Sequence, residues 1–486
     1  MRSFLNLLIL MMLISPINSF CQNTNSYNID VILSSEDKTL FINQVMKFKN
    51  TSNISIKEIV LEDWANSYVN NRTRLAKRIS DEYSRSFTFA KKKQRGSTLI
   101  KSITSDNIES WSVSKKTSDI INVYLKKELK RGESIEIEIN YIVKLPDSKF
   151  TGYGFDNNNN FYLKNWLIVF SNISKHNWSS QSNLNLNDQS LKKSSYKLKM
   201  SFDKSYDLFT NLTVNKTEIL IDKKNVYLSG YDINNVKIDL LIDKTYTNFQ
   251  NFNNEIETDI FKTSSLEEAE IKIKRVNNFI KDYFNDKSDL KLLVPQSDYD
   301  SNPFYGLNQL PSFISPFSDE FLEEIVFLKS FIVNYLNQKL NLNRRESHWI
   351  YKGLEIFIIN KYINDYYPKV RFIGKLSGIS FLKNYEISKM NFNDLFLNYS
   401  EYVQRLNLHQ SDDQSSEYLT RINHDIASPY HSGVGLIYIE NLIGEKDFKN
   451  LIEKINTIYS REELNNLFLS YNDKDLSWFI EDYIGN

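Results

Sequence analysis

Apolar and polar residues alternate along the first half of the chain. Between Ser134 and Lys144, isoleucine, tyrosine and valine occupy every second position, with mostly polar residues between them. Successive side chains of a strand point to opposite faces, so this period of two predicts strands with one face on a core. The same alternation is found at Ile29, Val31 and Leu33, at Tyr196, Leu198, Met200 and Phe202, and at Val236, Ile238, Leu240 and Ile242.

The apolar period changes near Asn248 to about 3.6 residues, which is typical of amphipathic helices. Ser264-Ser265-Leu266-Glu267 resembles an N-terminal cap, and it predicts a helix that ends at about Phe284. Its predicted inward residues are Ala269, Ile271, Val276, Ile280 and Phe284. A buried strand is predicted at 290–294, and further helices at 319–340, 349–366, 393–406, 434–442, 448–459 and 461–471.

Together these patterns predict an α+β fold. An N-terminal antiparallel β sandwich or saddle domain, residues 22–247, precedes a mainly helical domain, residues 248–486. The boundary is expected between Tyr246 and Glu255, where asparagine and glutamine crowd and the apolar period lapses. A chain of 486 residues is long enough for two or three separate cores.

Residues 1–21 have the pattern of an export signal. Arg2 supplies a positive charge, an apolar run extends from Phe4 to Ile14, and Ser15-Pro16 ends it. We expect cleavage after Cys21 and export to the periplasm, the outer envelope or the medium. The run is shorter than the roughly 20 residues that a transmembrane helix needs. Two alternatives stay open: an uncleaved hydrophobic helix, and a lipid anchor on Cys21, which the bulky Phe20 disfavours.

Charge and composition exclude several classes of function. Sixty basic and sixty acidic residues cancel, so charge gives no reason to propose nucleic acid or an anionic membrane surface as partner. Cys21 is the single cysteine, so the mature body has no disulfide. The sequence contains no G-x-S-x-G, no P-loop and no dinucleotide fingerprint, which are the signals of serine hydrolases and of nucleotide-binding enzymes.

The histidines give little support for a metal site. No two of them have the spacing of metal ligands on one helix; the five are His176, His348, His409, His424 and His431. His424 and His431 flank Tyr430, and Asp425 lies beside them in the sequence. A weak metal or acid–base site there is one interpretation, and solvated loop histidines are the other.

Six short segments, taken in order, resemble a known family. They are Asp63–Tyr68 (DWANSY), Leu129–Ser134 (LKRGES), Phe161–Trp166 (FYLKNW), Trp349–Leu354 (WIYKGL), Pro429–Gly433 (PYHSG) and Asp475–Phe479 (DLSWF). In this order they resemble the aminopeptidase N family of gluzincin zinc metallopeptidases, over nearly the whole mature chain. The resemblance implies a β saddle followed by a thermolysin-like peptidase domain, with zinc held between helices.

The resemblance also implies where a zinc site would lie. In the gluzincin pattern, H-E-x-x-H is followed about eighteen residues later by a glutamate. Aligned on Trp349–Leu354, the ligand positions are Lys329, Val333 and Lys352, and the general-base position is Ser330. Ammonium and isopropyl groups offer zinc no lone pair, and a hydroxyl is a poor base at neutral pH. We therefore expect a degenerate site that binds no metal and no other cofactor.

Two more positions of the family pattern are partly matched. The G-x-M-E-N strand, which receives the free amine of a peptide in the family, is matched loosely by Gly306, Asn308 and Gln309, where the amide of Gln309 replaces a carboxylate. The P-Y-x-x-G tyrosine falls at Tyr430, the one residue of catalytic type in place. An ordinary packing role for Tyr430 is the alternative.

The two lysines at ligand positions leave two interpretations. Lys329 and Lys352 point into the former metal pocket and pair with Glu324, Glu355 or a carboxylate of a ligand, or their stems run outward to solvent.

The predicted function is that of an exported, non-catalytic aminopeptidase-like protein that binds peptides or envelope proteins in the cleft between its domains. One alternative is an active zinc aminopeptidase with unrecognised ligands, and the other is a structural or assembly component of the cell envelope.

Overall fold

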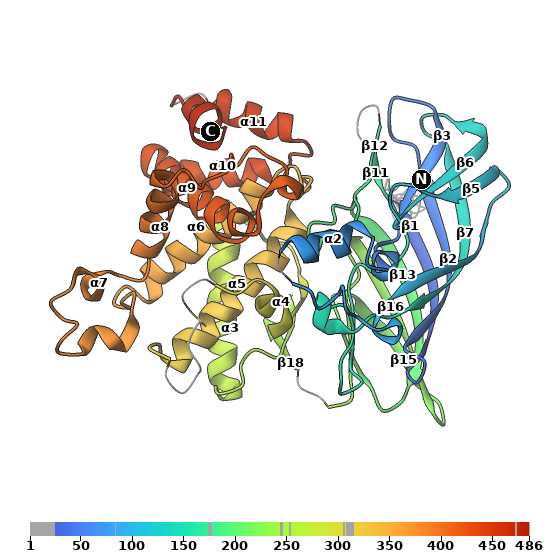
Figure 1. Cartoon of the computed structure of the whole chain (residues 1–486), viewed down its shortest axis with the longest axis horizontal. Coiled ribbons are helices and arrows are strands. Elements are labelled where there is room, and N and C mark those ends of the chain that lie inside the picture. Colours follow the sequence, from blue (N-terminus) through green and yellow to red (C-terminus); the bar gives the residue numbers. More distant parts are fainter. Residues whose placement is uncertain are drawn as a thin grey trace, which may run out of the picture.

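The structure is a computed structural model that describes residues 25–82, 84–173, 177–243, 246–251, 254–304, 307, 315–471 and 474–485. The predicted export signal with Cys21 lies outside the described residues, as do His176, Gly306, Asn308 and Gln309. A β-rich half and a helical half follow one another along the chain and lie side by side (Figure 1). The predicted α+β fold is therefore confirmed, and the domain boundary at residue 248 stays a prediction.

A seven-stranded sheet forms the largest element of the β-rich half. Its order is β15-β16-β13-β1-β2-β7-β4. Its strands are β1 (Ser26–Ser34), β2 (Thr39–Lys49), β4 (Ser97–Thr104), β7 (Ser134–Lys144), β13 (Ser194–Asp203), β15 (Thr213–Ile219) and β16 (Lys223–Ile233). All neighbours are antiparallel except β1 and β13, which are parallel. The antiparallel expectation is wrong for this pair, because the long connection from β1 to β13 provides the crossover that parallel pairing needs.

The predicted alternation is confirmed in β1, β7 and β13 of this sheet. In β7 the inward residues from Ile135 to Val143 are buried, and the residues between them are exposed or half-buried. The inward residues of β1 and β13 join the same core. The alternation predicted from Val236 to Ile242 is wrong, because all four residues of β17 (Ile238–Leu241), a strand of another sheet, are buried, and Ile242 follows the strand and is 42% exposed.

Two four-stranded sheets and a strand pair complete the β-rich half. One sheet has the order β10-β3-β6-β5 and the other β14-β17-β9-β8. Their remaining strands are β3 (Ile56–Glu62), β5 (Ile108–Val113), β6 (Ile120–Leu129), β8 (Gly154–Phe155), β9 (Phe161–Leu163), β10 (Val169–Phe170) and β14 (Asp207–Thr210), and the pair is β11 (Asn172–Ile173) with β12 (Trp178–Ser179). The short helix α2 (Arg74–Asp81), capped by the Thr73 hydroxyl, lies on the side that faces the helical half (Figure 1).

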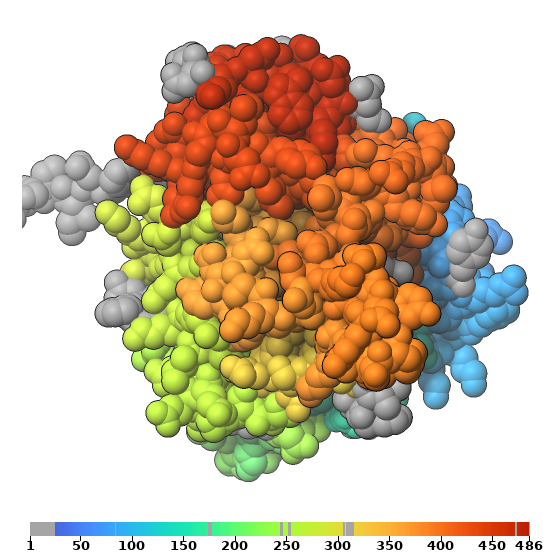
Figure 2. Space-filling view, turned by 90° about the vertical axis from the view of Figure 1, so that its left-hand side faces the viewer, coloured from blue at the N-terminus to red at the C-terminus, as the bar shows by residue number. Residues whose placement is uncertain are grey.

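The helical half contains a small sheet and most of the helices. The sheet has the order β18-β19-β20, with β18 (Thr247–Asn251), β19 (Asn254–Thr258) and β20 (Lys291–Val294). The helices are α3 (Leu266–Tyr283), α4 (Gln296–Ser301), α5 (Asp319–Lys339), α6 (His348–Tyr366), α7 (Glu386–Lys389), α8 (Asp394–Arg405), α9 (Ser428–Ile443), α10 (Glu445–Ile455) and α11 (Arg461–Leu469). Figure 2 shows the end face of this half, where the C-terminal helices pack above the segment that contains α3.

The start of α3 confirms the predicted cap. The Ser265 hydroxyl accepts from the Glu268 amide, and the Glu268 carboxylate accepts from the Ser265 amide. Ile271 was expected to face inward, but it is 58% exposed and Ile273 is buried instead. Ile273 lies four residues after the buried Ala269, which is the helical spacing of a shared face.

The helix predicted at 434–442 begins earlier in the structure. α9 starts at Ser428, directly after a π-helical turn at Asn423–Ala427, and so includes Tyr430. Gly433 and Gly435 within the helix weaken its apolar pattern, which explains the late predicted start. Among the described residues, none of the helices is both long enough and apolar enough to cross a bilayer.

Candidate functional site

A cavity of about 150 Å³ lies between the two halves. The β-rich half lines it with residues that include Lys164, Asn165 and Lys237, and the helical half lines it from α4, α5, α6 and the π-helical turn. Lys164 and Asn165 belong to the FYLKNW segment. The predicted interdomain cleft therefore corresponds to this cavity.

All four positions implied for the zinc site line the cavity. Lys329, Ser330 and Val333 come from α5, and Lys352 comes from α6. Residues three and four apart lie on one face of a helix, so a single face of α5 presents all three of its positions. The sequence alignment thus identified neighbouring side chains that belong to two different helices.

Glu355 lies between the two lysines. Lys352 Nζ donates to Glu355 Oε2 at 2.8 Å, and Lys329 Nζ lies 3.3 Å from Glu355 Oε1. Glu355 is 3% exposed and Lys329 is 5% exposed. The expected pairing with Glu355 is therefore confirmed, and the interpretation in which both lysine stems run to solvent is wrong. We call these three residues the Lys–Glu–Lys cluster.

Glu324, the other proposed partner, lies in a different cluster. Its carboxylate accepts from Arg275 Nε at 2.7 Å and from the hydroxyls of Tyr362 and Tyr367. Glu324 is fully buried, and it does not line the cavity. Arg275 of α3 therefore provides the counter-charge of Glu324.

Burial and the neighbouring charges shift the pKa values of the Lys–Glu–Lys cluster in opposite directions. Burial lowers the pKa of Lys329, and the nearby Glu355 carboxylate offsets this only in part. Burial would raise the pKa of Glu355, but Lys352 and Lys329 outweigh it and hold that pKa below its ordinary value. The cluster therefore places one carboxylate between the amino groups of two lysines.

These side chains do not fit a zinc ion. Lys329 and Lys352 offer positive charge where zinc requires lone pairs, and Val333 offers a hydrocarbon. Glu355 is the carboxylate nearest to the lysines, and both of its oxygens are already held by ammonium groups. Ser330 Oγ is buried and has no hydrogen-bond partner among the described residues.

Two histidines on the cavity wall form a stacked pair. The rings of His348 and His424 lie 4.3 Å apart, and His348 Nε2 lies 3.1 Å from the main-chain oxygen of His424. His424 Nδ1 contacts Asp425 Oδ1 at 2.6 Å. Burial, together with the charges of His424 and Lys352, holds the pKa of His348 well below its ordinary value. Sequence analysis missed this pair, because 76 residues separate the two histidines.

The expected site around Tyr430 is divided into two parts. His424 contacts Asp425, whereas His431 Nδ1 contacts Asp412 Oδ2 at 2.8 Å. Both histidines are buried, so their interpretation as solvated loop residues is also wrong. Asp412, His431 and His409 form the group of metal-type donors that the described residues bring together.

Hydrogen bonds account for His431 and for one oxygen of Asp412 in this second group, whereas His409 Nε2 and Asp412 Oδ1 are buried without a hydrogen-bond partner among the described residues. Ser432 Oγ donates to Asp412 Oδ2 at 2.8 Å, the same oxygen that His431 contacts. The ring of Tyr483 stacks on His431 at 4.0 Å. The Asp412 carboxylate thereby connects α9 to the segment that precedes it.

Tyr430 lies in an aromatic cluster. Its ring lies 5.2 Å from that of Phe396 and 5.5 Å from that of Tyr399, both nearly perpendicular to it. Tyr430 is buried, and it is not among the residues that line the cavity. The packing role is thus directly visible, and a catalytic role for Tyr430 stays a prediction.

A buried ion pair that the sequence did not indicate connects the halves beside the cavity. Arg345 Nε and Nη2 contact the two oxygens of Asp188 at 2.7 and 2.8 Å, and both residues are buried. Asp188 also accepts from Ser416 Oγ at 3.1 Å. Burial would raise the pKa of Asp188, but Arg345 outweighs it and lowers that pKa. Bidentate pairs of this kind fix orientation as well as charge.

Neither a family model nor a curated protein matches the sequence. Solved structures do match. An M1 zinc metallopeptidase from Deinococcus radiodurans has a TM-score of 0.60 at 9% identity, with 95% of this chain and 93% of that chain covered. A variant of that enzyme bound to a Tyr-Ser-Ala substrate has a TM-score of 0.58 at 10% identity, with 95% and 94% covered.

A two-domain M1 zinc metallopeptidase variant bound to L-tryptophan has a TM-score of 0.58 at 10% identity, with 96% of this chain and 95% of that chain covered. At such low identity the likeness establishes the fold, and it extends over nearly the full length of both chains. This chain therefore has the two-domain fold of these aminopeptidase N-like metallopeptidases, with a Lys–Glu–Lys cluster in its interdomain cavity.

Proposed function

We propose that this chain is an exported, non-catalytic relative of the aminopeptidase N family that binds peptides or envelope proteins in its interdomain cavity. The observation that carries the proposal is the Lys–Glu–Lys cluster, which occupies the place that the family pattern gives to zinc and its ligands. Export rests on the pattern of residues 1–21, and it places the ligand in the periplasm or outside the cell.

Loss of hydrolysis follows from the chemistry of the donors. A zinc ion polarises the scissile carbonyl and lowers the pKa of its bound water to about 7. A general base contributes a further factor of roughly 10² to 10⁴. Lys329, Ser330 and Lys352 supply neither function, because two ammonium groups repel a divalent cation and a serine hydroxyl is a poor base.

Peptide binding is supported by the position and lining of the cavity. It lies between the two halves, and polar side chains of both line it. A neighbouring fold, the metallopeptidase variant described above, was solved with a Tyr-Ser-Ala substrate. We infer that the loss of zinc leaves a cavity that still accepts an extended peptide.

Metal analysis of the purified chain, combined with hydrolysis of aminoacyl reporter substrates, tests the proposal. The wild-type chain is expected to carry substoichiometric zinc and to release no reporter above background. A variant with Lys329→His, Ser330→Glu, Val333→His and Lys352→Glu restores the family pattern and serves as a control for metal loading. Stoichiometric zinc in the wild-type chain, removed by a chelator together with hydrolysis, would support the active-enzyme alternative instead.

Calorimetric titration with short peptides tests the binding function. Saturable binding that is lost when the cavity is altered supports the proposal. If no peptide binds and the chain copurifies with an envelope complex through another surface, the structural alternative is favoured. N-terminal sequencing of the exported protein tests cleavage after Cys21.

A further inference from the structure

The cavity lining carries more positive than negative charge. Seven cationic side chains line it against five carboxylates. The cations are Arg78, Lys164, Lys237, Lys329, Arg344, Lys352 and Arg421, and the carboxylates are Glu82, Asp188, Asp298, Glu355 and Asp425. The excess lies in a confined space, where an unbalanced charge acts more strongly than it does at the surface.

Each of the five carboxylates already has a cationic or imidazole partner. Besides Glu355 and Asp188, described above, Glu82 pairs with Arg78 at 2.6 Å and Asp298 pairs with Lys237 at 2.9 Å. Asp425 contacts His424 at 2.6 Å, and Arg421 lies 3.5 Å from its second oxygen. None of these acids is available for a free amine of a ligand.

Two of the cations lack such a partner. Lys164 makes no hydrogen bond or ion pair with a residue in the described part of the chain, although Asp298 and Lys237 lie near enough to influence it. The Arg344 guanidinium donates to the main-chain oxygens of Asn187 and Asn337, and it lies over the ring of Tyr351. Tyr351 and Asp188 lie near enough to influence its charge, but Arg344 forms no ion pair with a carboxylate in the described part of the chain. Lys164 belongs to the β-rich half and Arg344 to the loop between α5 and α6.

Both groups lose hydration without forming an ion pair with any of the described carboxylates. Burial lowers the pKa of Lys164 and that of Arg344, so each positive charge is destabilised in the cavity. An anion that enters the cavity would restore the lost electrostatic stabilisation. Lys329 adds to this effect, because it shares the single carboxylate of Glu355 with Lys352.

We propose that the cavity recognises a carboxylate of its peptide ligand, which Lys164 and Arg344 bind from opposite halves. This inference rests on the proposed peptide-binding function and names the chemistry that the cavity selects. A zinc peptidase that acts on free N-termini needs carboxylates for the substrate amine. In this cavity each of the five lining carboxylates is already paired, whereas Lys164 and Arg344 form no ion pair among the described residues. The cavity is therefore expected to prefer a carboxylate of the peptide to its free amine. The carboxylate is a free C-terminus or the side chain of an acidic residue.

Four short peptides of equal length distinguish these sources. Ala-Ala-Ala with a free C-terminus is compared with its C-terminal amide. Acetyl-Ala-Glu-Ala amide is compared with acetyl-Ala-Gln-Ala amide, which has the same shape and no charge. Within at least one pair, the charged peptide is expected to bind roughly ten- to a hundredfold more tightly, as for a hydrogen bond to a charged group. A difference within the first pair shows that the cavity recognises a free C-terminus, and a difference within the second shows that it recognises an acidic side chain.

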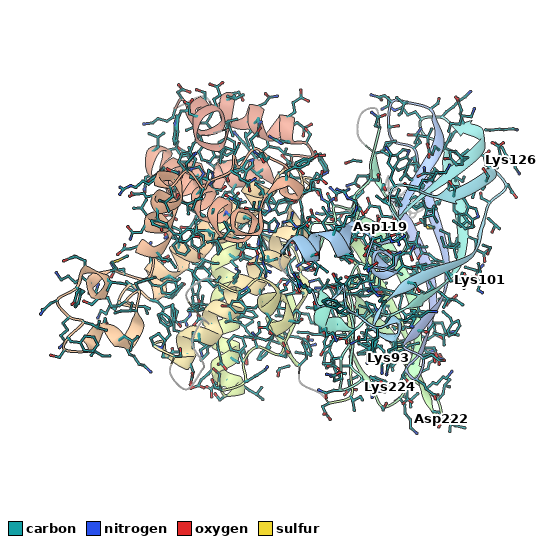
Figure 3. The ribbon with its side chains drawn as sticks, in the orientation of Figure 1. Lys93, Lys101, Asp119, Lys126, Asp222 and Lys224 are labelled. Atoms are coloured by element: carbon teal, nitrogen blue, oxygen red, sulfur yellow. The ribbon has the colours of Figure 1, made fainter. Side chains whose placement is uncertain are left out.

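Lys164→Met is the test variant, and Arg344→Met repeats the test from the other half. Each is expected to reduce the affinity for the preferred charged peptide by roughly tenfold or more, and to leave the affinity for its neutral counterpart unchanged. Lys101→Met is the matched control, because Lys101 is exposed and lies on the outer side of the β-rich half, away from the helices (Figure 3). Lys164→Met is expected to fold, because it removes a cation that has no counter-ion.

The outcomes separate the two proposals. If charged and neutral peptides bind equally well, the cavity binds peptides but does not select a carboxylate, and the present inference is overturned. If Lys164→Met and Arg344→Met both keep wild-type affinity and discrimination, the assignment to these side chains is also overturned. If no peptide binds at all, the proposed function fails, and this inference fails with it.

Discussion

Gly433 of α9 lies against Ile356 of α6, so closely that a Cβ atom at Gly433 would be 2.5 Å from Ile356 Cγ2 and 2.6 Å from Ile356 Cβ. On the other side of the crossing, a Cβ atom at Gly353 would be 3.0 Å from Ser432 Cβ. The glycines of the WIYKGL and PYHSG segments are therefore the contact points of two helices. Their close approach holds α6, with Lys352 and Glu355, against the rest of the helical half.

Gly433→Ala is expected to destabilise the protein by about 1–3 kcal/mol. Alanine is the better helix former by roughly 1 kcal/mol, but the added methyl group overlaps Ile356 Cβ, which cannot move without the main chain of α6. Chemical denaturation followed by circular dichroism at 222 nm, where helices dominate the signal, measures the change. Gly378→Ala is the control, because a Cβ atom there meets nothing within 4 Å. Equal stability of the two variants would contradict this packing.

Arg345→Met is expected to cost about 3–5 kcal/mol of stability, because it leaves the buried charge of Asp188 without its partner. The loss should be seen as an earlier separation of the two halves, measured by limited proteolysis of the segments between them. Arg405→Met is the control, since the exposed pair of Arg405 with Glu401 is expected to contribute only about 0–1 kcal/mol. Similar effects of both variants would show that the buried pair does not connect the halves.

The fold was predictable where a local pattern decides the structure. The alternation in β7 and the Ser265 cap of α3 depend on neighbouring residues, and both are confirmed. The parallel pairing of β1 with β13 depends on contacts between segments far apart in the chain, which periodicity does not encode. Ile271 was misassigned because two apolar residues, Ile271 and Ile273, competed for one inward position.

The candidate site was predictable where the family pattern fixes the spacing of its residues. The spacing placed Lys329, Ser330, Val333 and Lys352 together, and the structure brings all four to one cavity. The family pattern gives no information on ion pairs that are particular to this chain. Sequence analysis therefore found Glu355 only as one of two partners, and it missed the Arg345 pair and the stacked His348 entirely.

The buried His348 is expected to make the protein sensitive to mild acid. Its pKa is lowered on folding, so the unfolded chain binds a proton at pH values where the folded chain does not. The stability that the neutral, buried His348 contributes is fully present above the unfolded pKa of about 6.5. It is lost as the pH falls from that value toward the lower pKa of His348 in the folded chain. Unfolding temperatures measured between pH 8 and 5 should fall less for His348→Gln than for the wild-type chain. Parallel profiles for the two proteins would contradict the assignment.

The Lys–Glu–Lys cluster predicts opposite effects for its members. Glu355→Gln leaves the buried Lys329 and the half-buried Lys352 without their shared carboxylate and is expected to cost about 3–5 kcal/mol. Lys329→Met leaves Glu355 paired with Lys352 and is expected to be neutral or stabilising at pH 7. Denaturant titrations of both variants measure the asymmetry. A large loss in Lys329→Met would show that Lys329 stabilises the fold through contacts other than this cluster.

Alkaline pH provides an independent test of the same cluster. The pKa of Lys329 is lowered on folding, so between its folded pKa and the unfolded value of about 10.4 the unfolded chain binds more protons. The free energy of unfolding of the wild-type chain should therefore increase as the pH rises through this window. If Lys329→Met is more stable than the wild-type chain at pH 7, the difference should become smaller toward pH 10. Lys101→Met, which replaces an exposed lysine, is measured alongside as the control substitution. A difference between Lys329→Met and the wild-type chain that stays constant with pH would mean that burial does not destabilise the Lys329 ammonium group, and the charge balance proposed for the cavity would have to be revised.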